Sequence, residues 1–211
     1  MQSITIMKFW KNSISALFAT VTFASGTLLV AQTSVAKPSS TIAPSRLKTT
    51  IVNRSITESE VLAAQKAWGD ALVSISTTYD TEGKDAAKAL AGKVIDEAYG
   101  YQFGLVLFKP TLTTAPQTFR TTRASALAYF VGDDPAFPKD KGFALNGWRK
   151  VESKNVGIFI AGDTATSMGK VTVTDKDGNV ITVDKTWQFF KDDTGKLRIV
   201  VHHSSLPYSG K

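Results

Sequence analysis

The chain has 211 residues, of which 43% are hydrophobic and 20% charged, and these are the proportions of one globular domain. It contains no cysteine, which excludes disulfide frameworks, thiolate nucleophiles and cysteine-based metal centres. With only two histidines, a three-histidine metal site within one chain is excluded as well. The net charge of +7 is typical of nucleic-acid-binding proteins only if the basic residues gather on the folded domain.

The first residues are typical of a secretory signal peptide. Lys8 and Lys11 precede an uncharged apolar stretch at 14–30, and the sequence Ser-Val-Ala at 34–36 has small residues where signal peptidase reads them. We therefore expect residues 1–36 to be cleaved and the protein to be exported to the periplasm or the extracellular space. A retained membrane anchor is the alternative, but the small-residue site favours cleavage and no stable anchor afterwards.

The positive charge lies mostly outside the predicted domain. Residues 37–56 form a Ser/Thr/Pro-rich connector with four basic residues and no acidic one. From residue 57 to 211, the expected folded domain, 19 basic residues face 18 acidic ones. The domain therefore lacks the charge excess that nucleic-acid binding needs, and we expect no nucleic-acid partner.

Three helices are predicted in the first half of the domain. Thr57 and Glu60 have the spacing of a capping box, and apolar residues follow at helical spacing until Gly83 interrupts the chain. A third, short helix is expected to be capped by Thr121 or Thr122. The expected helices span about 58–76, 86–99 and 123–131.

After the helices the hydrophobic period changes to two, which predicts strands. Four long strands are expected, and the Gly- and Asp-rich turns between them predict an antiparallel meander. A further strand is expected before Pro110. The five predicted strands span 103–109, 147–161, 164–175, 180–191 and 197–204. Helices followed by meandering strands indicate an α+β fold, with the helices on one face of a curved sheet.

Three segments carry a resemblance to a known family: Leu-Phe-Lys-Pro at 107–110, the stretch 156–165, and the ending His-His-Ser-Ser-Leu-Pro at 202–207. Over 57–207 the chain resembles the nuclear transport factor 2-like (SnoaL-like) superfamily, and within it the association (hub) domain of calcium/calmodulin-dependent protein kinase II. The resemblance implies a cone-shaped fold with a pocket at its wide end and homo-oligomers built through the sheet. Some similar secreted proteins are labelled phosphoribosyl-AMP cyclohydrolase, but that enzyme resembles a cysteine-dependent metal enzyme, and this chain has no cysteine.

Strand alternation selects the candidate site residues. Alternate residues of a strand point to the same face, so Lys185 and Trp187 are expected to point inward on the strand 180–191. By the same rule His203 is expected to point inward with Leu197 and Ile199 on the strand 197–204. A histidine and a lysine beside aromatic side chains can bind a carboxylate or exchange a proton near neutral pH. His203 is therefore the candidate catalytic residue, and the candidate ligand-binding residues are Tyr99, Tyr101, Trp148, Lys185, Trp187 and Arg123.

Arg123 is included because the resemblance implies a hub pocket lined by arginines that bind small carboxylates. Purely structural roles stay open for all of these residues: a hydrogen-bonded histidine, tryptophans that fill the core, and a lysine that reaches out at the rim.

Two functions follow. The leading interpretation is an exported, oligomeric module that binds a small carboxylate or other small organic ligand without metal or cofactor. The alternative is a cofactor-free lyase or isomerase of the SnoaL or ketosteroid isomerase type that uses His203 as acid or base. A roomy pocket with converging polar groups favours the enzyme, and a filled pocket with a buried, bonded histidine favours the module.

Overall fold

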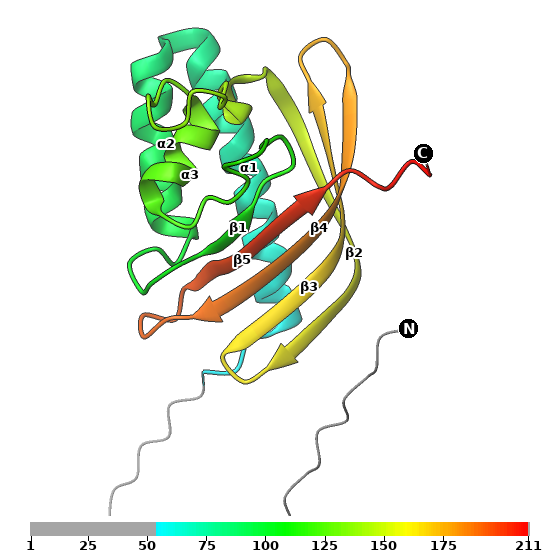
Figure 1. Ribbon diagram of the computed structural model, residues 1–211. Helices are drawn as coiled ribbons and strands as arrows, with labels where there is room; N and C mark the ends of the chain where they lie inside the picture. Colours follow the sequence, from blue (N-terminus) through cyan, green and yellow to red (C-terminus); the bar gives the residue numbers. More distant parts are fainter. Residues whose placement is uncertain (1–53, 211) are drawn as a thin grey trace, which may run out of the picture. The chain divides into compact units, whose positions relative to one another are not determined.

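The computed structural model describes residues 54–210, which fold into three helices and one five-stranded sheet. Figure 1 shows the helices on one face of a curved sheet, which is the predicted α+β arrangement. The predicted signal peptide and residues 37–53 of the predicted connector lie outside the described residues. The helices are α1 (Glu58–Glu82), α2 (Lys84–Ala98) and α3 (Arg123–Val131), and the strands are β1 (Leu107–Lys109), β2 (Trp148–Ala161), β3 (Thr164–Asp175), β4 (Val180–Lys191) and β5 (Leu197–Ser205).

The strand order in the sheet is β1-β5-β4-β3-β2. The strands β2 to β5 pair antiparallel with their chain neighbours, so the predicted meander is confirmed. The strand β1 instead lies parallel to β5, with Leu107 opposite Val201. It is shorter than predicted, because the chain turns at Gly104, whose φ of +148° favours glycine. No helix among residues 54–210 is long and apolar enough to cross a membrane.

The predicted capping box begins α1. The Glu60 N–H donates to the Thr57 hydroxyl, and the Thr57 N–H donates to the Glu60 carboxylate at 2.8 Å. The helix continues six residues beyond its predicted end and stops at Gly83, whose φ is +87°. Thr122 caps α3 in the same way.

A β-bulge in β5 decides which histidine faces the helices. Gln188 of β4 pairs with Val201, whereas the next residue, Phe189, pairs with Ile199, so Val200 is an extra residue in β5. The alternation of side chains therefore shifts by one position after Ile199. His202 is buried on the helix side of the sheet, and His203 is exposed on the opposite face. The prediction that His203 points inward is wrong for this reason.

Candidate functional site

A cavity of about 270 Å³ lies between the helices and the sheet. Most of its wall is apolar or aromatic, with polar side chains from α3, β4, β5 and the chain after β1. Ile181 and Leu206 line it and are exposed, so the cavity reaches solvent at that end of the sheet. The aromatic lining is Trp68, Phe108, Tyr129, Phe130 and Phe143, and the polar lining is Thr111, Tyr129, Lys185, His202 and Ser204.

A chain of hydrogen bonds runs from the cavity wall into the core. Lys185 Nζ contacts His202 Nε2, and the two side chains are 5% and 2% exposed. His202 Nδ1 lies 2.8 Å from the Tyr99 hydroxyl. The same hydroxyl accepts a hydrogen bond of 3.0 Å from Trp68 Nε1. All four groups are buried, so these hydrogen bonds must satisfy them without bulk water.

The Trp68 indole N–H, at the far end of this series of hydrogen bonds, determines the direction of each of them. An indole N–H only donates, so the Tyr99 oxygen accepts from Trp68. The Tyr99 hydroxyl then donates its proton to His202 Nδ1. If the hydroxyl proton pointed in another direction, this buried donor would have no acceptor. His202 therefore carries its proton on Nε2 and donates it to Lys185. This arrangement requires the lone pair of a neutral Lys185 amine.

The electrostatics favour the same neutral amine. Burial lowers the pKa of Lys185 to about 7, and no salt bridge in the described part of the chain includes it. The faces of Trp68 and Trp187, whose centroids lie 4.6 and 5.0 Å from Nζ, support the ammonium form when a proton arrives. Burial, and then the charge of Lys185, hold the pKa of His202 well below its usual range. The amine can therefore gain and lose one proton near neutral pH while the imidazole stays neutral.

Three hydroxyl groups complete the polar lining. Ser204 lies directly opposite Lys185 in the β4–β5 register, so the two side chains are cross-strand neighbours on the helix side of the sheet. Burial raises the pKa of Tyr129, which stays a protonated phenol and a hydrogen-bond donor. Thr111 adds a hydroxyl from the chain just after β1. A small oxygen-rich anion can be held between these donors and a protonated Lys185.

The structure brings part of the predicted set together. Lys185 lines the cavity, and the buried Trp187 ring lies beneath Lys185 Nζ. Tyr99 is fully buried and positions His202. The inward placement of Lys185 and Trp187 follows the predicted alternation because β4 keeps an unbroken register with β3. Thr111, Tyr129, His202 and Ser204 were not among the predicted site residues.

Three other predicted residues lie away from this cavity's lining. The Tyr101 hydroxyl donates to a backbone carbonyl at 2.8 Å, and Trp148 Nε1 donates to the carbonyl of Phe143 at 2.6 Å. Arg123 forms an exposed salt bridge with Asp96. His203 faces away from the cavity, as the bulge requires.

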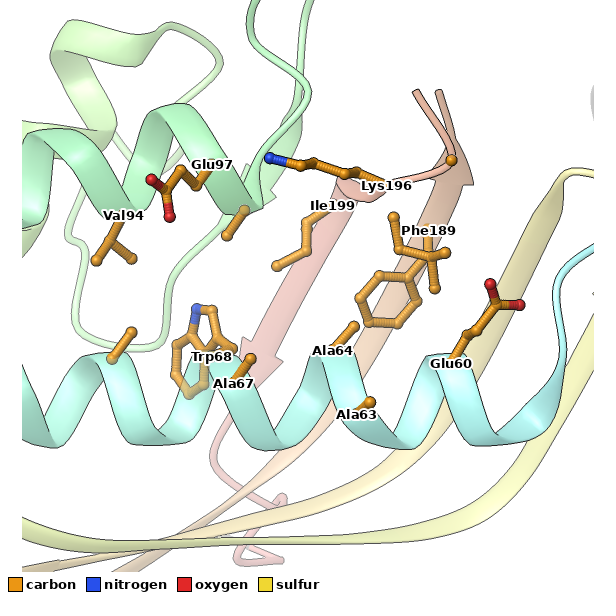
Figure 2. A pocket seen from close by; sticks show the side chains of 14 residues that line it. Glu60, Ala63, Ala64, Ala67, Trp68, Val94, Glu97, Phe189, Lys196 and Ile199 are labelled. Atoms are coloured by element: carbon orange, nitrogen blue, oxygen red, sulfur yellow. The ribbon is translucent and has the colours of Figure 1, made fainter. Parts of the chain in front are cut away.

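A second cavity, an open groove of about 450 Å³, lies between α1, α2 and the turn that joins β4 to β5 (Figure 2). Its floor is formed by alanines of α1, and Glu97 and Lys196 lie at its rim. Trp68 lines both cavities. Unlike the open groove, the enclosed cavity combines apolar walls with converging hydroxyl, imidazole and amine groups, and this combination marks it as the candidate site.

Among residues 54–210, no three histidine, cysteine, aspartate or glutamate side chains lie close enough to hold a metal ion. The helices, the sheet and the cavity define an α+β protein with a largely apolar pocket of small-ligand size. The chain belongs to the metal-independent carbonic anhydrase family, which matches residues 59–206.

Two relatives support this assignment. A protein named metal-independent carbonic anhydrase from Nostoc sp. (strain PCC 7120) is 70% identical over 203 residues, which cover 96% of this chain and 99% of that protein. The crystal structure of a cyanobacterial iota-carbonic anhydrase complexed with bicarbonate is 77% identical and has a TM-score of 0.75. That match covers 77% of this chain and 99% of the crystallised one.

Association (hub) domain structures are among the solved structures to which this chain is similar. A calcium/calmodulin-dependent protein kinase II association domain structure from Xanthomonas campestris is 22% identical, with a TM-score of 0.47, over 77% of this chain and 96% of that one. The carbonic anhydrase family replaces the hub domain as the family of this chain.

Proposed function

We propose that this protein interconverts CO2 and bicarbonate in the enclosed cavity, with the Lys185 amine as the proton acceptor. The observation that carries the proposal is the buried Lys185–His202 pair, set in an apolar cavity with three hydroxyl groups. Membership of the metal-independent carbonic anhydrase family supports the reaction. The bicarbonate complex of the 77%-identical relative supports the ligand.

The hydration step needs only groups that line the cavity. Apolar walls suit CO2, which carries no net charge. The oxygen of a water molecule forms a bond to the carbon, one C=O π pair moves onto an oxygen, and Lys185 Nζ takes a proton from the water. The products are bicarbonate and an ammonium group. The Ser204 and Tyr129 hydroxyls donate hydrogen bonds to the oxygen on which negative charge develops.

The amine must then return its proton to the solvent. Because burial lowers the pKa of Lys185 to about 7, neither protonation state is strongly trapped near neutral pH. The Trp68–Tyr99–His202 chain keeps the imidazole in one tautomer, whose Nε2–H holds the neutral amine in place until its lone pair takes the proton from water. These three residues thus position the proton acceptor.

Measured CO2 hydration tests the proposal. Replacing Lys185 by Met removes the proton acceptor and keeps an apolar side chain, so we expect kcat/KM to fall by about 100-fold or more. Stopped-flow hydration with a pH indicator, on protein dialysed against a chelator, measures this. The matched control is Lys196→Met at the rim of the open groove, which we expect to keep wild-type activity.

Wild-type activity in folded Lys185→Met protein would contradict the role of Lys185. Saturable bicarbonate binding without turnover by the wild type would instead support a binding module for small anions, the coarser interpretation that the pocket already fits.

We further propose that the protein works outside the cytoplasm. The charged start, apolar stretch and small-residue site within residues 1–36 support export. The intact mass of the protein recovered from its own cells should lack residues 1–36, and a full-length mass would count against cleavage.

A further inference from the structure

A neutral amine that faces CO2 has two reactions open to it. It can accept a proton from the water that attacks CO2, or it can attack the CO2 carbon itself. Lys185 Nζ lies on the wall of the enclosed cavity, and the direction of the hydrogen bonds assigns it a lone pair that accepts from His202. The attack of the amine on CO2 rests on one part of the proposed function, which is that CO2 enters this cavity.

We propose that Lys185 is a carbamylation site, at which CO2 adds reversibly to Nζ. The Nζ lone pair leaves its hydrogen bond with His202 Nε2–H and forms the N–C bond, and one C=O π pair of CO2 moves onto an oxygen. One Nζ proton then leaves to a base of the solvent buffer. The products are a carbamate anion on the lysine and one released proton, so atoms and charge balance without any oxidant, reductant or metal.

The surroundings of Nζ suit this anion. Ser204, the cross-strand neighbour of Lys185, has a hydroxyl that can donate to a carbamate oxygen. The His202 Nε2–H, which donates to the amine lone pair, becomes a second donor once that lone pair is shared with carbon. No carboxylate lines the cavity, so no like charge opposes the carbamate.

The groups that face Lys185 make carbamylation depend on pH through the amine itself. The element β5 contributes His202, which burial keeps neutral, and α3 contributes Tyr129, whose phenol stays protonated. Tyr99, just after α2, is likewise a buried, protonated phenol. The residues that face the cavity from α1, β1 and β3 include Trp68, Phe108 and Val171, and none of these titrates.

Lys109, on β1, is another charged group near this end of the sheet, with Nζ 3.5 Å from the Ser204 carbonyl oxygen. Its positive charge favours a carbamate over an ammonium group at Lys185. His203, on the opposite face of the sheet, is a further titratable group, and burial lowers its pKa.

Carbamylation has a consequence for the proposed reaction. It removes the lone pair that accepts the proton from water. We therefore expect CO2 hydration to decline during incubation at high CO2 and alkaline pH, and to recover after CO2 is removed.

Covalent trapping tests the proposal independently of activity. The wild-type protein is equilibrated with ¹³C-labelled CO2 at constant dissolved CO2, at about pH 6 and about pH 8.5. It is then treated with triethyloxonium, which alkylates carbamate oxygens, and digested for mass spectrometry. We expect the labelled adduct on Lys185, more than tenfold more abundant at the higher pH, because the neutral fraction of the amine rises about tenfold and the lower proton concentration further favours a reaction that releases a proton.

The exposed Lys196 in the same digest is the internal control and should carry little adduct, because it lies outside the enclosed cavity and its donors. Ser204→Ala keeps the amine and removes one donor, so its adduct should be several-fold less abundant. A ¹³C NMR carbamate signal that is absent in folded Lys185→Met protein gives a second measurement.

Absence of the adduct on Lys185, or equal labelling of Lys185 and Lys196, would overturn the carbamylation proposal. These outcomes are separate from the hydration assay. If the wild-type protein carries the carbamate but does not hydrate CO2, only the proposed function is contradicted. If it hydrates CO2 but carries no carbamate, only the carbamylation proposal is contradicted.

Discussion

At the scale of single residues, the burial of Lys185 without an acidic partner should lower the stability of the fold. Its side chain is 5% exposed and has no acidic partner in the described part of the chain. In the unfolded chain a lysine binds a proton up to about pH 10.4, whereas burial lowers the pKa of Lys185 in the folded protein to about 7. Between these values the unfolded state binds more protons, so stability rises with pH across this window.

The substitution Lys185→Met exposes this cost. The variant should be about 1–3 kcal/mol more stable than the wild type at pH 7, after subtracting the unpaired His202 Nε2–H. The advantage should shrink or reverse near pH 10, where a lysine in the unfolded chain also loses its proton. Urea unfolding of both proteins at the two pH values measures it. If the difference in stability between the two proteins were the same at both pH values, the pKa of Lys185 would not be lowered in the folded protein.

Residue placement could be predicted from the sequence where the sheet register is regular. The inward positions of Lys185 and Trp187 follow from simple alternation, because β4 has no irregularity against β3. The same count fails for His203, because the extra residue Val200 shifts the alternation and turns His202 inward. A bulge depends on the partner strand, and the sequence of β5 alone holds no sign of it.

At the scale of elements, a buried polar bridge connects α1 to the sheet. Gln65 is 2% exposed, and its Nε2 donates to Asn155 Oδ1 at 3.0 Å and to Ser167 Oγ at 2.9 Å. Asn155 Nδ2 donates back to Gln65 Oε1 at 2.8 Å. The bridge lies where the β2–β3 register shifts, between Asn155 and Gly157. It therefore fixes the helix at the point where the two strands lose regular pairing.

Removing this bridge should destabilise the protein more than removing a surface ion pair. Gln65→Ala leaves polar groups of Asn155 and Ser167 unpaired, and we expect a loss of about 2–3 kcal/mol in unfolding free energy. The neighbouring Lys66→Ala breaks only the exposed pair with Asp70 and should cost at most about 0.5 kcal/mol. Urea denaturation compares the two variants. Equal losses would show that the bridge adds no more than a surface contact.

Element boundaries were predictable where turn or cap residues mark them. The bounds of α3, β3 and β4 agree with the predicted ranges, since a capping threonine and Gly- and Asp-containing turns end the regular patterns. The end of α1 was placed too early, because apolar spacing fades before the helix meets Gly83. The parallel pairing of β1 with β5 joins segments far apart in the chain, and local sequence signals do not specify such a partner.

At the scale of the whole molecule, the sheet face away from the helices is the surface on which self-association is expected. Met168 lies between the buried Ser167 and Gly169 on β3, so its side chain points away from the helices and is 60% exposed. Phe159, opposite Thr166, points the same way and is 73% exposed. These two exposed apolar side chains and the 14-residue edge strand β2 suit contact with a second copy of the chain.

We therefore predict that the folded domain is a homo-oligomer and that the double substitution Phe159→Lys, Met168→Lys makes it monomeric. Each lysine places a positive charge on an apolar surface that faces its counterpart in the assembly, and desolvating these like charges is unfavourable. Size-exclusion chromatography with light scattering, over a range of protein concentrations, reports the mass. Leu62→Lys, at an exposed position of α1 on the other side of the sheet, is the control that should keep the wild-type mass. The double variant should retain CO2 hydration if the wild type has it, because neither residue lines the enclosed cavity. A wild-type chain that remains monomeric at every concentration would contradict the prediction and leave Phe159 and Met168 as isolated surface residues.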